Sequence, residues 1–387
     1  MRSAKRDAFV ADLAPAYLPR RPTETVLYGL VCQHLESFLA CAREPCPSCA
    51  GRRMANTAAT VVDRVLPDVP VRQYVLSLPF DLRRLAAFDP EVLTAFGRTF
   101  VDTIFASYRA RAKRAGLEDM HCGAINFVQR FGGSLNLNVH FHVVVLDGVF
   151  ALEPEPGVVS HPARPPMRDE LGGIVRRVQK RAQAWLRRHG HLDERPLEDR
   201  SNEAPEQTAL NACASIAMAR GQMATLANEN EPEHDHSSLP GKTSVAVDRD
   251  GFNLHAGVRI EAGDDVGREK LCRYAARPAL SLERLRRLPG GGVAYRLKYV
   301  GRGGGKHRVM LPMEFMARLA ALIPPPRYPL VRYAGVLGPH SVWRKDVVPR
   351  PRERPPACDD ASRDVGRASG LGISDVPESG PVESSSV

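Results

Sequence analysis

The strongest structural signal in the chain is the stretch SLNLNVHFHVVVLD at residues 134–147. Its residues alternate between polar and apolar, as expected for a β-strand, in which every second side chain lies on the same face. The apolar face consists of Leu135, Leu137, Val139, Phe141, Val143 and Val145. The polar face consists of Ser134, Asn136, Asn138, His140 and His142, before it turns apolar at Val144. We therefore expect a hydrophobic core behind this strand and polar chemistry in front of it.

Strands and helices are mixed on both sides of this stretch. Strands are predicted at 73–79 and 124–131, the second followed by a Gly-Gly turn, and further strands within 244–260, 293–300 and 306–311. Apolar residues at helical spacing predict helices at 26–39, 91–116, 169–189 and 312–323. The pattern indicates an α+β fold with an antiparallel sheet and flanking helices.

Changes in composition divide the chain into five parts. Residues 1–70 are predicted to form an N-terminal helix with a Cys-containing module, and residues 71–194 the first part of the main domain. Residues 195–242 are interpreted as a polar insertion or linker, because they include the stretch NENEPEHDHSS. Residues 243–350 form the second part of the main domain, and 351–387 a disordered tail rich in Pro, Ser and Gly. Residues 151–168 are predicted to be a proline-rich loop.

The charge balance favours a polyanionic partner. The chain has 387 residues, and 54 Lys or Arg against 44 Asp or Glu give it a net charge of +10. Residues 268–350 hold 18 Lys or Arg against 4 Asp or Glu, a net charge of +14, which predicts a surface for a phosphate backbone. No apolar run reaches the ~20 residues of a membrane helix, and the first residues lack the apolar core of a signal peptide. The expected location is the cytoplasm, with no membrane partner.

His140 and His142 are the strongest candidates for chemistry. They should project from one strand face about 7 Å apart, a spacing at which two imidazoles can chelate one divalent cation. The alternative is that both are polar residues on a solvated sheet face. Two enzyme classes also compete: a cupin-like metal oxygenase with Asp147 as its carboxylate, and an endonuclease in which a tyrosine attacks a metal-polarised phosphate. The long basic helices on either side favour the nuclease.

Several longer strings resemble one family. They are CPSCAGRRM at 46–54, VRQYVLSLPF at 71–80, FVQRFGGSLNLNVHFH at 127–142, FNLHAGV at 252–258, LCRYAARP at 271–278 and PPPRYPLVRYAGVL at 324–337. In this order they are similar to the rolling-circle insertion-sequence transposases of the IS91 and ISCR type. The resemblance runs from about Thr25 to Pro349 and so covers most of the chain.

The resemblance implies a relaxase-like nuclease of the HUH type, named after its His-hydrophobic-His strand, with His140-Phe141-His142 as that motif. It implies that Tyr274 is the nucleophile, because the family's tyrosine lies in an Arg-Tyr-x-x-Arg-Pro context. Family members with two tyrosines carry the first one four residues earlier, where this chain has Lys270. The chain therefore resembles the single-tyrosine branch. The implied reaction nicks and rejoins single-stranded DNA ends of an insertion sequence and target DNA through a 5′-phosphotyrosine intermediate, with Mg²⁺ or Mn²⁺.

The same family resemblance suggests the remaining site residues. Gln129 and His255 are the candidates for a third metal ligand, and Arg273, Arg277 and Arg130 are expected to contact phosphate or DNA. Arg273 and Arg277, expected on the same short helix as the tyrosine, could also favour its anionic form.

The N-terminal cysteines depart from the family pattern. The family has a zinc ribbon with two Cys pairs, and Cys46 and Cys49 resemble the second pair, whereas the first pair is missing. A tetrahedral Zn²⁺ site would have to recruit Cys41, together with Cys32 or His34. The alternative is a degenerate module, in which case the chain would be a catalytically weakened, DNA-binding remnant of a transposase.

Overall fold

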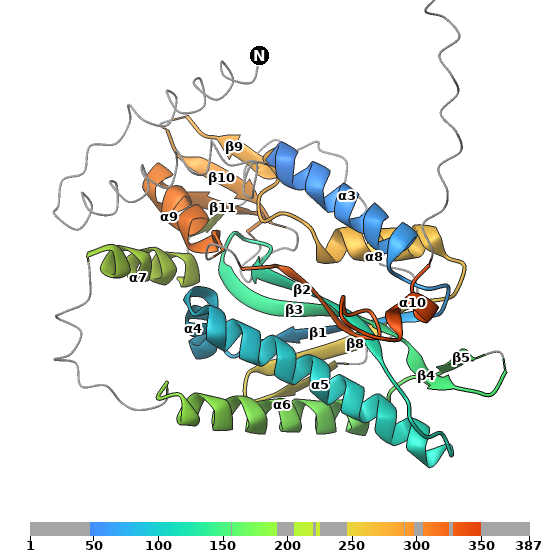
Figure 1. The fold of residues 1–387 in the computed structure, drawn as a ribbon. Coiled ribbons are helices and arrows are strands. Elements are labelled where there is room, and N and C mark those ends of the chain that lie inside the picture. Colours follow the sequence, from blue (N-terminus) through green and yellow to red (C-terminus); the bar gives the residue numbers. More distant parts are fainter. Residues whose placement is uncertain are drawn as a thin grey trace, which may run out of the picture. The chain divides into compact units, whose positions relative to one another are not determined.

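The computed structural model describes residues 47–155, 157–191, 205–219, 222–224, 246–289, 291–297, 305–324 and 328–349. Their centre is a six-stranded antiparallel sheet in the order β12-β2-β3-β1-β8-β7 (Figure 1). Its strands are β1 (Val71–Ser77), β2 (Gly123–Phe131), β3 (Leu137–Leu146), β7 (Ala246–Arg249), β8 (Phe252–Ile260) and β12 (Val331–Gly335). The predicted α+β fold with an antiparallel sheet is confirmed.

Helices cover both faces of this sheet. On one face lie α4 (Phe80–Phe88), α5 (Pro90–Arg114) and α6 (Arg168–Arg188), with α5 packed on α6. On the other face lie α3 (Pro47–Arg64) and α8 (Asp265–Ala275), which pack on each other (Figure 1). Helix α5 begins where it does because the Asp89 carboxylate accepts hydrogen bonds from the backbone N–H of Glu91 and of Val92, at 2.8 and 3.1 Å.

Side chains of β3 alternate between the two faces of the sheet, so this strand contributes to two hydrophobic cores. Its odd-numbered residues from Leu137 to Val145 pack with Phe96, Phe100 and Ile104 of α5 in the larger core. Val144 and Leu146 point to the opposite face and pack with α3 and α8 in the smaller one. The predicted apolar face is thus confirmed. On the polar face His140 and His142 are buried, and the ring of Tyr274 on α8 lies against His142. Ser134, Asn136 and Asn138 of the same face are half-buried.

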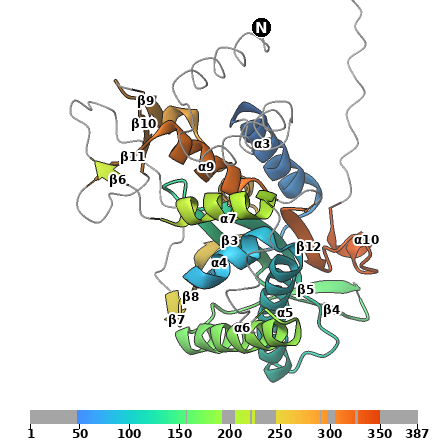
Figure 2. The same ribbon diagram turned by 90° about the vertical axis from the view of Figure 1, so that its left-hand side faces the viewer.

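A second, four-stranded sheet has the order β6-β11-β10-β9, and α7 packs against α9 beside it (Figure 2). Its strands are β6 (Gln222–Ala224), β9 (Leu285–Arg287), β10 (Val293–Arg296) and β11 (His307–Met310). The remaining elements are α7 (Pro205–Met218), the 3₁₀ turn η2 (Leu282–Arg284), α9 (Pro312–Leu322), α10 (Arg344–Val347) and the hairpin of β4 (Gly148–Leu152) with β5 (Val158–Pro162).

Two sequence interpretations need correction. Part of the predicted polar linker 195–242 is folded: α7 buries Cys213, Ala214 and Ala217, which recur at helical spacing, and β6 pairs with β11. The predicted loop 151–168 contains most of the β4–β5 hairpin and the first residue of α6. In both cases polar or proline-rich neighbours hid a short regular element.

Several arginines of the basic segment 268–350 are buried, so fewer of its charges face solvent than its composition suggests. Arg268, Arg308 and Arg318 are buried, and Arg318 pairs with Glu314 within α9. Arg308 and Arg318 both donate to the carbonyl of Ala219 at the end of α7. These guanidinium groups hold the chain together instead of facing solvent. Separately, none of the helices in the described ranges is long and apolar enough to cross a membrane.

Asp147, directly after β3, is the centre of a buried polar cluster. Its carboxylate accepts two hydrogen bonds from Arg72, at 3.0 and 2.9 Å, one from Tyr108 at 2.6 Å and one from Arg259 at 2.7 Å. Tyr74 extends the network by donating to the Tyr108 hydroxyl at 3.3 Å. Burial raises the pKa of Tyr74 to about 12, so both phenols stay protonated. The cluster joins β1, β3, β8 and α5.

We predict that Asp147→Ala destabilises the chain by about 3–5 kcal/mol, because it leaves the buried Arg72 guanidinium without its counter-ion. Urea unfolding at pH 7 measures this change, with the exposed Asp248→Ala as matched control, which should stay within about 0.5 kcal/mol of the unsubstituted chain. Adding Arg72→Met to Asp147→Ala should restore part of the loss. Equal, small effects of Asp147→Ala and Asp248→Ala would contradict the structural role of the cluster.

Candidate functional site

His140 and His142 lie side by side on β3, on the sheet face that carries α8. Their ring centroids are 4.9 Å apart. Both side chains are buried, with exposed fractions of 6% and 2%. The structure thus brings the predicted pair together, in an environment where each nitrogen atom needs a partner.

The hydrogen bonds of the pair determine which nitrogen atoms are available. His140 Nδ1 lies 2.8 Å from the carbonyl oxygen of Asn138, which can only accept, so Nδ1 carries the proton and Nε2 presents a lone pair. His142 Nδ1 lies 3.0 Å from the side-chain amide of Gln73 on β1. Within the described residues, His142 Nε2 is buried without a hydrogen-bond partner. Each histidine therefore has its Nδ1 engaged. His140 Nε2 presents a lone pair, whereas His142 Nε2 carries the proton as long as the amide nitrogen of Gln73 donates to Nδ1.

Both imidazoles are neutral at physiological pH. Burial lowers the pKa of His140 to about 4, and the positive charges of Arg277 and Arg83 act in the same direction. Burial, followed by the neighbouring His140 and Arg277, lowers the pKa of His142 well below its usual value. Since metals bind the neutral imidazole, this environment suits metal ligation without competition from protons.

Gln129 connects the pair to helix α8. It lies on β2, directly opposite His140 in the strand register. Its side-chain amide donates to the carbonyl oxygens of Tyr274 and Ala275, at 2.9 and 2.7 Å, and so binds the last turn of α8. Its Oε1 is buried without a hydrogen-bond partner in the part of the chain that is described. The amide nitrogen of Gln129 thus positions α8, and the amide oxygen is left for another ligand.

Tyr274 lies on this last turn of α8, against the histidine pair. Its ring is 5.4 Å from the ring of His142 and nearly perpendicular to it. The guanidinium of Arg277, just beyond the end of α8, lies 4.9 Å from the Tyr274 ring and 5.5 Å from that of Phe131. Tyr274 itself is half-buried.

Other tyrosines have different surroundings. Tyr74 and Tyr108 belong to the Asp147 cluster, and Tyr295 is buried with its hydroxyl near the carbonyl of Ala279, at 3.5 Å. Tyr333 lies on the edge strand β12. Among the described tyrosines, Tyr274 is the one for which a ring contact with the histidine pair is found.

The predicted arginines occupy three different environments. Arg277 stacks on Tyr274, but it follows α8 instead of lying within it. Arg273 is bound to Glu269 one turn earlier on α8, with a shortest contact of 2.6 Å. Arg130 is buried, donates to the carbonyls of Ala87 and Ala321, and so ties α4 to α9. Only Arg277 has the position expected of a phosphate ligand at this site.

The candidates for a third metal ligand differ in distance from the pair. Gln129 lies on the strand next to β3, whereas His255 lies on β8, two strands from β3 and about 10 Å away by strand spacing. Asp147, the carboxylate that a cupin would use, is saturated by Arg72, Tyr108 and Arg259. No group of three or more His, Cys, Asp or Glu side chains suited to a metal occurs within the described residues. The geometry favours Gln129.

Sequence reasoning missed Gln73 and Arg83. Gln73 is a buried polar residue of β1, next to the buried Arg72, and its polar side chain within a predicted strand was the available signal. Arg83 of α4 had no comparable signal, because only the packing of α4 brings its charge near His140.

The predicted zinc module falls largely outside the described residues. Cys32, Cys41 and Cys46 are not described, and Cys49 lies in the first turn of α3. The structure thus leaves the prediction of a Zn²⁺ site untested.

Comparison with known proteins gives the family. The model of the family described as "Putative transposase" (Y2_Tnp) matches residues 123–344, which is more than half of the chain and includes β2, β3 and α8. The transposase for insertion sequence element IS801 of Pseudomonas savastanoi pv. phaseolicola is 30% identical over 118 residues. That match covers 30% of this chain and 27% of that protein. No solved structure matches the chain. The chain belongs to this family of transposases, as the resemblance of its motifs to insertion-sequence transposases indicates.

Proposed function

We propose that the chain is an HUH-type transposase that nicks and rejoins single-stranded DNA with Tyr274 as nucleophile. The observation that carries the proposal is the contact of the Tyr274 ring with His142, 5.4 Å between centroids, beside a buried and neutral histidine pair. The six-stranded antiparallel sheet with the pair on an interior strand and the tyrosine on a covering helix agrees with a relaxase-like nuclease.

The residues fit a divalent cation. His140 Nε2, His142 Nε2 and Gln129 Oε1 are two imidazole nitrogens and one amide oxygen, and the last two atoms lack hydrogen-bond partners among the described residues. The lone pair of His142 Nε2 requires that Gln73 present its amide oxygen to Nδ1, which a 180° rotation of the amide achieves. A Mg²⁺ or Mn²⁺ ion held there would neutralise charge on the scissile phosphate.

The chemistry proceeds by exchange of one phosphorus–oxygen bond for another. The Tyr274 hydroxyl oxygen forms a bond to the scissile phosphorus as the bond to the 3′-oxygen breaks, and the proton lost by the phenol balances the one gained by the leaving 3′-oxygen. The products are a 5′-phosphotyrosine and a free 3′-hydroxyl. Attack by a 3′-hydroxyl reverses the step and rejoins the strands. Arg277, at the Tyr274 ring, is placed to contact the phosphate.

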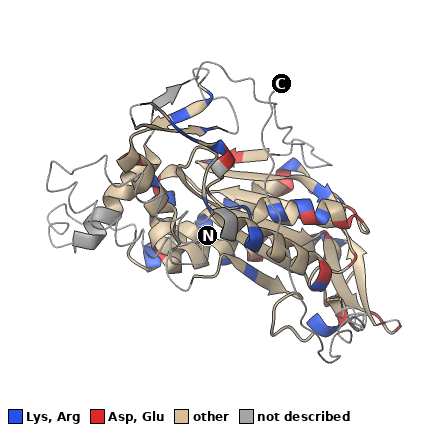
Figure 3. Ribbon diagram, turned by 90° about the horizontal axis from the view of Figure 1, so that it is seen from above, with Lys and Arg blue, Asp and Glu red and all other residues tan. Residues whose placement is uncertain are grey.

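The DNA substrate would approach a surface of mixed charge. Figure 3 shows Lys and Arg spread over several elements, with Asp and Glu among them. Arg83 and Arg277 are the cations whose charges act on His140.

The first test is formation of a covalent protein–DNA adduct. The chain is incubated with Mn²⁺ and single-stranded oligonucleotides covering the DNA on both sides of its coding sequence, and adducts are detected on denaturing protein gels. Tyr274→Phe should abolish the adduct, because it removes the nucleophilic oxygen. Tyr333→Phe, the matched control on β12, should keep it.

An adduct that survives Tyr274→Phe would refute the assignment. If the unsubstituted chain binds these oligonucleotides but forms no adduct with any of them, the alternative of a DNA-binding remnant is favoured.

The second test addresses the metal ligands. Mn²⁺ at about 100 times its dissociation constant should stabilise the chain by about 2.7 kcal/mol, measured as a shift of the thermal transition. His140→Ala should remove this shift, and Gln129→Leu should weaken Mn²⁺ binding by about 10–100-fold. His255→Gln, the matched control for the other candidate ligand, should leave Mn²⁺ affinity unchanged. If His255→Gln weakened Mn²⁺ binding and Gln129→Leu left it unchanged, His255 would be identified as the third ligand.

A further inference from the structure

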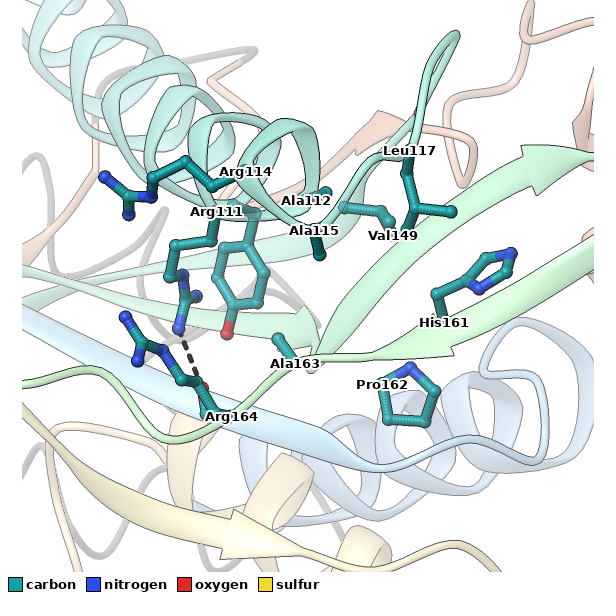
Figure 4. Close-up of a pocket in the computed structure, with 11 residues that line it drawn as sticks. Arg111, Ala112, Arg114, Ala115, Leu117, Val149, His161, Pro162, Ala163 and Arg164 are labelled. Carbon is teal, nitrogen blue, oxygen red and sulfur yellow. Dashed lines mark hydrogen bonds between the residues drawn. The ribbon is translucent and has the colours of Figure 1, made fainter.

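A cavity of about 540 Å³ lies at the C-terminal end of α5, away from the histidine pair (Figure 4). The last turn of α5 forms one wall, and the β4–β5 hairpin with the segment that follows it forms the other. It lies on the α5 side of the sheet, whereas α8 and Tyr274 lie on the opposite side. None of the residues assigned to nicking lines it.

Arginine side chains dominate the polar part of the cavity. Arg111, Arg114 and Arg164 line it, and Glu170 is the carboxylate near two of them, 3.6 Å from Arg114 and 3.5 Å from Arg164. These are ion-pair distances too long for strong hydrogen bonds, and Arg114 and Arg164 are largely exposed. The two exposed guanidinium groups can therefore turn toward a ligand.

Arg111 is the fixed cation of the cavity. Its side chain is 92% buried, it stacks 4.3 Å over the Tyr108 ring, and its Nη1 donates to the carbonyl oxygen of Arg164 at 2.7 Å (Figure 4). Its Nε and Nη2 have no hydrogen-bond partner, and no carboxylate pairs with it, in the described part of the chain. Burying a cation without a counter-ion is costly, so an anion entering the cavity would be favoured.

Tyr108 and His161 also line the cavity, and the other lining residues are apolar. They are Ala112, Ala115, Leu117, Val149, Pro162 and Ala163. The volume lies within the range of small-molecule sites, and an apolar wall beside a cationic end suits a ligand with a planar ring and an anionic group. A lone inorganic anion would leave most of this wall without contacts.

We propose that this cavity binds one nucleotide, with its base against the apolar wall and its phosphate at Arg111 and Arg164. The same chemistry is offered by a free deoxynucleotide and by one nucleotide of a DNA strand. The second source rests on the proposed function, because it requires that the chain engage single-stranded DNA.

The test uses the full chain carrying Tyr274→Phe, so that binding is measured without nicking. Deoxythymidine monophosphate, thymidine, inorganic phosphate and a single-stranded oligothymidylate are titrated calorimetrically. The monophosphate should bind about tenfold or more tightly than thymidine, because thymidine lacks the charge-assisted hydrogen bonds of the phosphate. Inorganic phosphate binding as tightly as the monophosphate would overturn the assignment of a nucleotide.

Two pairs of matched variants locate the ligand. Arg111→Met should weaken binding about tenfold or more, whereas Arg98→Met, which removes an exposed arginine of the same helix, should have no effect. Ala115→Trp should block the cavity from the exposed end of α5 without changing charge, whereas Ala110→Trp, also exposed on α5, should not. Ala115→Trp keeps the test valid if Arg111→Met does not fold.

A free nucleotide and a nucleotide of a DNA strand would give different results in these titrations. A free nucleotide is the ligand if the monophosphate binds and Ala115→Trp leaves oligothymidylate affinity unchanged. A nucleotide of DNA is the ligand if Ala115→Trp and Arg111→Met weaken oligothymidylate binding relative to their controls. If neither probe responds to the cavity variants, the proposal is wrong, while an adduct at Tyr274 in the unsubstituted chain would still support the proposed function.

Discussion

Burial of β3 on both of its faces is the constraint on which the rest of the structure depends. The strand pairs with β1 and β2, so its backbone groups are satisfied within the sheet, and helices enclose its side chains from both sides. A polar side chain in such a strand must find a partner or pay the cost of desolvation. His140 and His142 are accordingly neutral and fixed through Nδ1, and Asp147 at the strand end is surrounded by four donors from three residues.

The same constraint explains how the tyrosine reaches the histidines. Gln129 is polar and buried in β2, and the carbonyls at the end of α8 lack helical partners. Two hydrogen bonds from the amide nitrogen of Gln129 satisfy these carbonyls and bring Tyr274 to His142, while Gln129 Oε1 has no hydrogen-bond partner among the described residues. Asp264 defines the start of the helix by accepting from the Gly267 N–H at 2.8 Å. The position of the proposed nucleophile is thus determined at both ends of a short helix.

How much the sequence reveals depends on the range of the interactions. Strands β1, β2 and β3 and helices α5 and α6 could be predicted closely, because most of their apolar residues recur at the spacing of a strand or of a helix. The role of Arg130 could not be predicted. Its position next to Gln129 suggests a phosphate ligand, but the side chain packs between α4 and α9, which are far apart in the chain. Helix α7 was missed because its small apolar residues lie within a polar segment. Tyr274 could be chosen only through family resemblance, since no local pattern separates it from other tyrosines.

The proposed nicking centre and the arginine cavity are separated by the sheet and joined by the residues that cross it. Tyr108 lines the cavity, and the guanidinium of Arg111 stacks on its ring. The Tyr108 hydroxyl donates to Asp147. Asp147 lies five residues after His142, about 17 Å away along the strand direction. At that separation the cavity cannot hold the scissile phosphate itself. A DNA strand bound both at the histidine pair and in the arginine cavity would have to pass around the end of the sheet, with several nucleotides between the two sites. Since Asp147 fixes Tyr108 and Tyr108 supports Arg111, the cavity is preorganised, and little ordering would oppose binding of a ligand there.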